Sequence, residues 1–326
     1  MSVKVAINGF GRIGRNILRS AIENCRKDIE IVAINDLAPV ETNAHLLKYD
    51  SVHGKFPGAI LINGNIIDAG DGPIRVTNLR NPEDLPWGDV DIVLECTGIF
   101  TSKEQASIHL KSGARRVLVS APSSGADRTI AYGVNHNTLG SDDVIVSNAS
   151  CTTNCMAPVA KVLDETVGIK KGFMTTIHSY TGDQPTLDRG HSDLYRARAA
   201  ALNMIPTSTG AARAVGLVLP QLEGKLDGVS IRVPTPNVSC VDLTFEAAQG
   251  IRFSRAFVPF PVCLRLRLKT DYICSVFLNL DHQQISAHNE SGGLYKHDYQ
   301  IELGIKLLDK FYFQHSLICR GRSCLL

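Results

Sequence analysis

The feature that most constrains this chain is a glycine-rich turn that directly follows an apolar run near the N-terminus. Val3–Ile7 predicts a buried strand, and Gly9–Gly14 then follows the pattern G-x-G-x-x-G. A helix-forming stretch comes next, and a second apolar run at Ile29–Ile34 ends just before Asp36. This order of strand, turn, helix and strand predicts a βαβ unit, from which parallel sheets are built.

The βαβ unit has the pattern of a dinucleotide-binding site. Glycines at positions Gly9, Gly11 and Gly14 let backbone N–H groups approach a pyrophosphate at the positive end of a helix. A carboxylate at the end of the second strand, here Asp36, accepts hydrogen bonds from the adenosine ribose and repels a 2′-phosphate. The sequence therefore predicts that this part of the chain binds NAD as its cofactor.

Strands and helices continue to alternate along the first half of the chain. The fold class that we expect is α/β, with a Rossmann-type doubly wound parallel sheet in an NAD-binding domain of residues 1–150. Pro57–Gly72, which contains Asn63-Gly64, predicts a hairpin inserted into this domain. The remaining predicted elements are strands at Ile74–Thr77, Ile92–Glu95, Val117–Ser120 and Val144–Ser147, and a helix at Ser102–Ser112.

Strands dominate the pattern after residue 150, which predicts an α+β catalytic domain of residues 151–326. A stretch rich in Pro, Gly and Arg at Thr181–Ala199 predicts a long ordered loop. The predicted regular elements are a helix at Thr153–Thr166 and strands at Gly172–His178, Val229–Val233 and Ser239–Glu246.

Composition excludes several other classes of protein. Of the 326 residues, 44% are hydrophobic, which excludes intrinsic disorder, and no apolar run reaches the roughly 18 residues of a membrane span. The formal net charge of +2 gives no support for nucleic acid as a partner. Nine cysteines in a chain without an apolar leader indicate a reducing, cytoplasmic setting.

A candidate nucleophile lies at the junction of the two predicted domains. A predicted strand ends near Asn148 and a helix begins near Cys151, and a thiol at a helix N-terminus is stabilised as its thiolate. His178 ends a later strand and is a candidate partner that holds the thiolate and moves protons. Cys155 lies one helical turn beyond Cys151. Because no second Cys/His pair follows at ligand spacing, we expect Cys155 in the helix core and no metal site.

A thiolate acting with a nicotinamide indicates aldehyde oxidation. The thiolate adds to the carbonyl, and loss of a hydride leaves a thioester that a second nucleophile can attack. Guanidinium groups and hydroxyls suit phosphate oxygens. Such side chains follow the Cys/His pair at Thr181, Arg196, Arg198, Ser208, Thr209 and Arg232.

The chain resembles the phosphorylating, NAD-dependent glyceraldehyde-3-phosphate dehydrogenases. The resemblance covers the first three quarters of the chain in order and is carried by distinctive runs. These are Ile7–Arg15, Asn35–Leu37, Tyr49–Gly54, Glu95–Gly98, Ser120–Pro122, Ser147–Cys155, His178–Thr181, Ala197–Ala201, Ile205–Ala212 and Ile231–Val238.

The resemblance implies a role for each matching position. Cys151 would be the nucleophile and His178 its base, in a homotetramer that uses glyceraldehyde 3-phosphate and inorganic phosphate. Tyr195 departs from the family, where an arginine is expected in the interface loop. The cofactor residues implied, beyond the glycines and Asp36, are Arg12, Ile13, Arg80, Thr97 and Ser120. The substrate phosphate would be held by Thr181 and Arg232, and the attacking phosphate by Ser150, Thr152, Arg196, Thr209 and Gly210.

Residues 249–326 lack the family pattern. The terminal helix and the tryptophan-containing strand of the family are missing, and Trp87 is the only tryptophan of the chain. We therefore hypothesise that this segment is translated from a shifted reading frame. We expect it to leave a sheet edge unpaired, to lower stability and to weaken nicotinamide positioning. The alternating run Leu264–Lys269 predicts a strand.

Two alternative functions follow from these observations. Erythrose-4-phosphate dehydrogenases share most of the same motifs, so that activity stays open. The altered C-terminal segment also favours a catalytically impaired NAD-binding or interaction protein, although Cys151 and His178 are both present.

Overall fold

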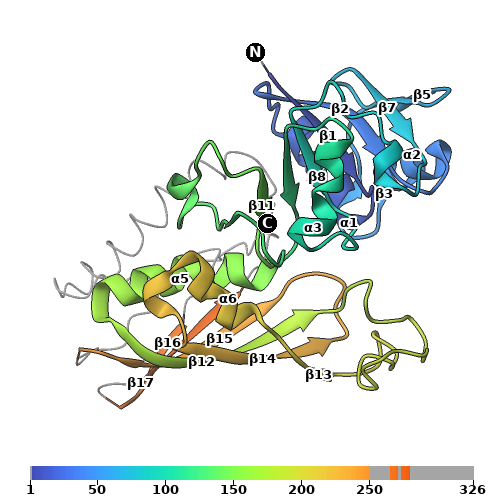
Figure 1. Ribbon diagram of the computed structural model, residues 1–326. Helices are drawn as coiled ribbons and strands as arrows, with labels where there is room; N and C mark the ends of the chain where they lie inside the picture. Colours follow the sequence, from blue (N-terminus) through green and yellow to red (C-terminus); the bar gives the residue numbers. More distant parts are fainter. Residues whose placement is uncertain (1, 250–264, 271–272, 280–326) are drawn as a thin grey trace, which may run out of the picture. The chain divides into compact units, whose positions relative to one another are not determined.

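The computed structural model describes residues 2–249, 265–270 and 273–279, which form two compact units that divide between Ser150 and Cys151 (Figure 1). Each unit has its own sheet. Among the residues that the structure describes, no helix is long and apolar enough to cross a membrane.

The first unit contains a nine-stranded sheet of order β10-β11-β9-β8-β1-β2-β7-β6-β5. Strands from β10 to β7 pair in parallel, and the hairpin of β5 and β6 continues the sheet in antiparallel pairing. The predicted Rossmann-type parallel sheet is therefore confirmed. The strands are β1 Val3–Asn8, β2 Ile29–Asn35, β5 Leu61–Asn63, β6 Ile66–Asp68, β7 Pro73–Thr77, β8 Ile92–Glu95, β9 Arg116–Val119, β10 Arg128–Thr129 and β11 Ile145–Ser147, with β3 Tyr49–Asp50 and β4 Gly54–Lys55 as a separate pair.

Around β1, both faces of this sheet are buried, as a doubly wound sheet requires. Val5 and Ile7 of β1 pack with Leu18 of α1 on one face. Ala6, which points to the opposite face, packs with Trp87. The helices of the unit are α1 Arg12–Glu23, α2 Val40–Lys48, α3 Lys103–Ala106 and α4 Ile108–Lys111, with short 3-10 turns η1 Pro82–Asp84 and η2 His136–Thr138.

The predicted helix at Ser102–Ser112 is divided into α3 and α4. Ser102 caps the start of α3 by accepting a hydrogen bond from Gln105 N at 3.2 Å. Ser107 lies between the two helices, and its hydroxyl donates to the Glu104 carbonyl at 2.6 Å. A serine hydroxyl that binds a nearby carbonyl competes with the helical hydrogen bonds, which explains the break.

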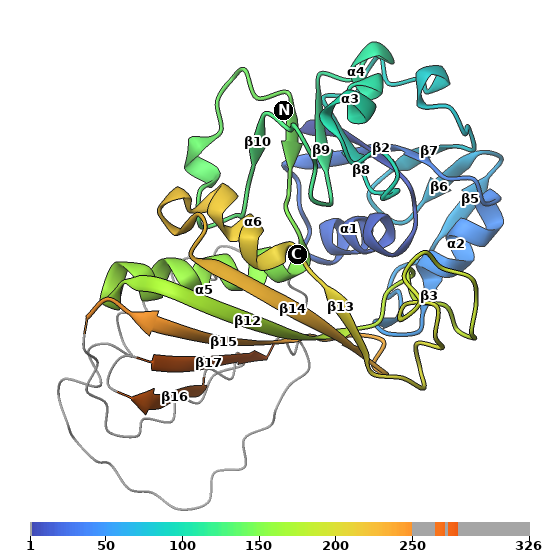
Figure 2. The same ribbon diagram turned by 60° about the horizontal axis from the view of Figure 1, so that its bottom comes forward.

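The second unit has a six-stranded sheet of order β13-β14-β12-β15-β17-β16, with α5 and α6 against one face (Figures 1 and 2). The predicted helix and strands are present, whereas β13 and α6 were not predicted from the sequence. The elements are α5 Cys151–Val167, β12 Ile169–Ser179, β13 Ile205–Ser208, α6 Ala211–Val218, η3 Pro220–Leu222, β14 Leu226–Val233, β15 Cys240–Ala247, β16 Arg265–Thr270 and β17 Ile273–Asn279.

Two strands of this sheet come from the segment that lacks the family pattern. The strand predicted at Leu264–Lys269 is confirmed as β16, Arg265–Thr270. The expectation of an unpaired edge is wrong, because β17 pairs with β15 in antiparallel register from Cys240↔Asn279 to Glu246↔Ile273. The apolar run Ile273–Asn279 has the composition of a strand, which suits it to this position. Residues 250–264, 271–272 and 280–326 lie outside the described part of the chain. The expected effects of this segment on stability and on nicotinamide positioning therefore stay predictions.

Candidate active site

The glycine-rich turn between β1 and α1 requires glycine at two of its positions, Gly9 and Gly14. Gly9 has a φ of +91°, and a Cβ at this position would lie 2.7 Å from Thr97 N. A Cβ on Gly14 would lie 2.2 Å from Gly9 O and 2.9 Å from Ile7 Cγ2. Real Cβ atoms do not approach other atoms so closely, so both positions exclude side chains for reasons of packing.

The N-terminus of α1 fits the pyrophosphate of a dinucleotide. The N-cap of α1 is Gly11, so no side chain caps the first N–H groups of the helix. A Cβ on Gly11 would meet no atom within 4 Å. The first turn of the helix carries no acidic residue. Asp36 is held beside this turn, since its carboxylate accepts hydrogen bonds from Phe10 N at 2.8 Å and Ala38 N at 2.9 Å. These residues are suited to hold NAD.

The other predicted cofactor residues have different surroundings. Arg12 pairs with the Asp50 carboxylate, and Ile13 is half-buried in the first turn of α1. Arg80 is exposed after β7. Ser120 follows β9, and both its amide and its hydroxyl donate to Glu95 O at 3.0 Å. Thr97 packs against Gly9, so the structure brings Thr97 to the glycine turn but gives Arg80 no such contact.

The second unit brings the candidate nucleophile and base together. Cys151 is the first residue of α5, and His178 is a buried residue near the end of β12. Cys151 Sγ lies 3.3 Å from His178 Nε2. The helix N-terminus and the imidazole therefore act on the same sulfur atom.

The surroundings of Cys151 lower the pKa of its thiol. Although Cys151 is exposed, enough protein surrounds the sulfur that desolvation is the largest influence and raises the pKa. The hydrogen bond and charge of His178, with hydrogen bonds from Thr152, outweigh desolvation, so the net shift is downward. Cys155 has no such partners, and burial raises its pKa to about 12. Only one of these two thiols is set up to react as a thiolate.

Arg232 contacts the far side of the His178 ring. The parallel register of β12 and β14 places Arg232 opposite His178. Arg232 Nη1 lies 2.7 Å from His178 Nδ1 and donates to Ser179 O at 3.0 Å, while His178 Nδ1 also lies 2.7 Å from Ser179 O. Burial lowers the pKa of Arg232. Nδ1 can therefore accept a hydrogen bond from Arg232 when it is unprotonated, and it can donate one to Ser179 O when it is protonated.

The remaining predicted phosphate residues lie on loops and helix ends. Arg196 is oriented by Asp183, at 2.8 Å between Nη1 and Oδ2, a contact that sequence reasoning missed. The only available signal was an acidic residue in an arginine-rich loop. Tyr195, the departure from the family, is 65% exposed. Thr181 is exposed after β12, Thr209 and Gly210 precede α6, Thr152 is buried in the first turn of α5, and Ser150 ends the first unit.

Replacing His178 by asparagine is expected to raise the pH at which Cys151 becomes reactive. The imidazole is the main group that lowers the thiol pKa, and its removal leaves the opposing desolvation in place. The pH dependence of iodoacetamide alkylation, measured without cofactor, should shift upward toward the ordinary cysteine range. Cys151→Ser measures the background from other thiols, including exposed Cys25. An unchanged profile would show that His178 does not stabilise the thiolate.

The NAD-binding features of the first unit, together with the thiol–imidazole pair of the second, fit the class of NAD-dependent oxidoreductases. Residues 3–103 match the family model described as glyceraldehyde 3-phosphate dehydrogenase, NAD binding domain, and residues 150–254 match the C-terminal domain of the same enzyme. The chain belongs to the glyceraldehyde-3-phosphate dehydrogenase family. The resemblance found in the sequence is therefore confirmed, and the matched region ends close to Ala248, where the family pattern was found to stop.

Several bacterial relatives named glyceraldehyde-3-phosphate dehydrogenase are similar over the same proportion of the chain. The protein of Cereibacter sphaeroides is 72% identical over 249 residues, which are 76% of this chain and 75% of the relative. That of Xanthobacter flavus is 71% identical over 252 residues, or 77% and 75%. That of Geobacillus stearothermophilus is 57% identical over 254 residues, which are 77% of this chain and 75% of the relative.

Proposed function

We propose that this chain oxidises D-glyceraldehyde 3-phosphate to 1,3-bisphosphoglycerate with reduction of NAD, in glycolysis and gluconeogenesis. The observation that carries the proposal is the 3.3 Å contact between Cys151 Sγ and His178 Nε2 at the start of α5. Relatives of similar sequence bear the name of this enzyme. We propose further that the protein is a cytoplasmic homotetramer, as the family resemblance implies.

Cys151 would begin the reaction as a thiolate. Its sulfur adds to the aldehyde carbon to form a thiohemiacetal, and the carbonyl π electrons move to oxygen. His178 Nε2–H then donates its proton to that oxygen, and the start of α5 stabilises the charge that develops there. Nδ1 carries a proton both before and after this transfer, and Ser179 O, 2.7 Å away, accepts its hydrogen bond in both states.

His178 would also return the thiohemiacetal to a carbonyl. Its Nε2 takes the hydroxyl proton back as the C–H bond breaks, which leaves an acyl thioester on Cys151. NAD, when bound, supplies the acceptor for the hydride. An oxygen of inorganic phosphate then attacks the thioester carbon, the C–S bond breaks, and the acyl phosphate leaves with Cys151 restored as a thiolate.

Two groups of side chains would hold the phosphates. Arg232 and Thr181 are proposed to hold the phosphate of the substrate. Thr181 follows β12, and Arg232 lies on β14, which pairs with β12. Arg196 is proposed to orient the attacking phosphate, and its ion pair with Asp183 would fix the guanidinium in advance. The other residues proposed for the attacking phosphate are Ser150, Thr152, Thr209 and Gly210.

Purified full-length protein is expected to form NADH from NAD and glyceraldehyde 3-phosphate only when inorganic phosphate is present. Phosphate is needed because it releases the acyl group from Cys151. Absorbance at the NADH wavelength measures the rate, and erythrose 4-phosphate serves as the competing substrate. Higher kcat/KM for erythrose 4-phosphate would contradict the proposed substrate. No turnover with either aldehyde, from a chain that binds NAD, would contradict the proposed activity.

A further inference from the structure

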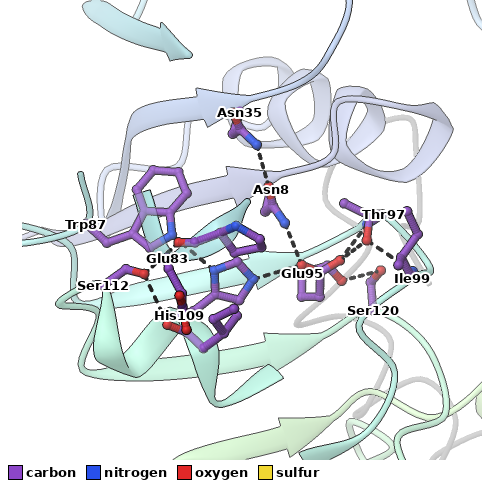
Figure 3. Close-up of polar contacts among 12 residues, drawn as sticks. Asn8, Asn35, Glu83, Trp87, Glu95, Thr97, Ile99, His109, Ser112 and Ser120 are labelled. Carbon is purple, nitrogen blue, oxygen red and sulfur yellow. Dashed lines mark hydrogen bonds and ion pairs between the residues drawn. The ribbon is translucent and has the colours of Figure 1, made fainter. Parts of the chain in front are cut away.

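A buried carboxylate connects several of the predicted cofactor residues of the first unit. Glu95 ends β8, is 1% exposed, and lies at the centre of the polar cluster in Figure 3. Its Oε2 accepts hydrogen bonds from Asn8 Nδ2 at 2.7 Å and His109 Nε2 at 2.9 Å. Its Oε1 accepts from Thr97 N at 2.8 Å and from the Thr97 hydroxyl. Four donors therefore converge on the Glu95 carboxylate. No role was predicted for Glu95 from the sequence.

The neighbours of the cluster fix His109 as a donor to Glu95. Trp87 Nε1–H can only donate, and it lies 3.1 Å from His109 Nδ1 (Figure 3). Nδ1 must then be unprotonated, so the proton of the neutral ring is on Nε2, which faces Glu95. Both His109 and Trp87 are fully buried, which keeps water from replacing either contact.

Asn8 is fixed in the same way from the opposite side. Leu79 N–H donates to Asn35 Oδ1 at 2.9 Å, so the Asn35 amide nitrogen is turned toward Asn8 Oδ1, 2.8 Å away. Asn8 Nδ2 is left to donate to Glu95. The ends of β1, β2 and β8 are thereby joined through side chains that point in one defined order (Figure 3).

The cluster holds the turn that packs against the glycine-rich turn. Both donors of Thr97 are engaged by Glu95, and the Thr97 hydroxyl accepts from Ile99 N at 3.0 Å. Thr97 N is also the nearest of the backbone atoms that leave no room for a side chain on Gly9. The backbone carbonyl of Glu95 receives the amide and hydroxyl of Ser120. One residue therefore sets the positions of Gly9, Thr97 and Ser120 relative to one another.

We propose that Glu95 is a positioning residue for NAD, which acts through Thr97 and requires the negative charge of its carboxylate. The inference rests on NAD binding by the first unit and goes beyond the proposed reaction. Under this proposal, the affinity for NAD depends on a buried hydrogen-bond network behind the residues that contact the cofactor. The network runs from Glu95 to Trp87 on one side and to Leu79 on the other.

Glu95→Gln tests the requirement for charge in the full-length protein. The amide has the same shape, but its NH2 meets a donor whichever way it is turned, either Thr97 N–H or the pair of Asn8 and His109. Because hydrogen bonds to a charged group are the strong ones, we expect the Kd for NAD, measured by titration calorimetry, to rise about tenfold. At saturating NAD, kcat should change less than about threefold, since the thiol site is untouched. An unchanged Kd would overturn the proposal.

A double-mutant cycle separates positioning from a general loss of stability. Thr97→Val removes the hydroxyl that donates to Glu95, so Glu95→Gln should weaken NAD binding much less in this background than in the wild type. Fully additive effects on Kd would contradict action through Thr97.

Trp87→Phe provides a test that leaves Glu95 itself unchanged, in case Glu95→Gln does not fold. Loss of the Trp87 N–H frees His109 Nδ1, so we expect NAD affinity to fall about threefold. Leu85→Val is the matched control, because Leu85 is 3% exposed in the same apolar cluster as Trp87 and its side chain has no group that could hydrogen-bond to His109. Equal loss of NAD affinity in both variants would overturn the proposal. The readout is binding, so a chain that binds NAD without turnover would contradict the proposed reaction and leave this test intact.

Discussion

Replacing Cys151 by serine is expected to lower the rate of aldehyde oxidation by at least about 1000-fold, because a serine hydroxyl in the same position is not ionised. The groups that surround the sulfur stabilise a thiolate, and they cannot lower the pKa of an alcohol to the working range. Single-turnover formation of NADH, followed in the presence of inorganic phosphate, measures the loss.

Two controls accompany this substitution. Cys155→Ser should retain most of the activity, because burial raises the Cys155 pKa to about 12 and leaves that thiol protonated. NAD binding should be unchanged in Cys151→Ser, since the cofactor is held by the first unit. Substantial turnover by Cys151→Ser would exclude a covalent mechanism through this residue.

Replacing Gly14 by alanine is expected to lower the free energy of unfolding by about 2–4 kcal/mol and to abolish NAD binding. The new Cβ would lie 2.2 Å from Gly9 O, a backbone atom of the same turn, so the turn itself must move. Urea denaturation monitored by circular dichroism measures the stability, and calorimetric titration measures the binding.

Gly11→Ala is the matched control for Gly14→Ala. A Cβ on Gly11 meets no protein atom within 4 Å, so this variant should keep the wild-type stability. It should nevertheless bind NAD more weakly, because the methyl group occupies the space where a pyrophosphate would approach the helix N-terminus. If Gly11→Ala lowered the free energy of unfolding as much as Gly14→Ala, the steric explanation for the requirement of glycine at position 14 would be wrong.

Local pattern was sufficient to predict most of the first unit. The alternation of apolar runs with turns predicted the parallel strands apart from the two-residue β10, and β8 was predicted with its observed bounds, Ile92–Glu95. The short helix α2, Val40–Lys48, was missed. Its first turn follows Pro39, and only three of its nine residues are buried, so its apolar period is weak.

Contacts between distant segments account for what sequence pattern does not predict at the candidate site. Cys151 and His178 could be proposed separately from the ends of a helix and a strand. The contact of Arg232 with His178 depends on the pairing register of β12 and β14, which no local run encodes. The Glu95 cluster likewise joins residues up to 87 positions apart. Sequence pattern also gives no sign of the positive φ of Ala149, +57°, two residues before Cys151, because residues other than glycine rarely adopt it.

The position of β12 within its sheet determines how far the unmatched C-terminal segment lies from His178. His178 is carried by a strand with two strands on one side, β14 and β13, and three on the other, β15, β17 and β16. The two described strands from the segment after Ala248, β17 and β16, are therefore the second and third neighbours of the strand that carries His178, and β15 separates them from it. Both direct neighbours of this strand, β14 and β15, belong to the part of the chain that matches the family, so the strand under His178 keeps its family pairing although the outer strands come from the unmatched segment.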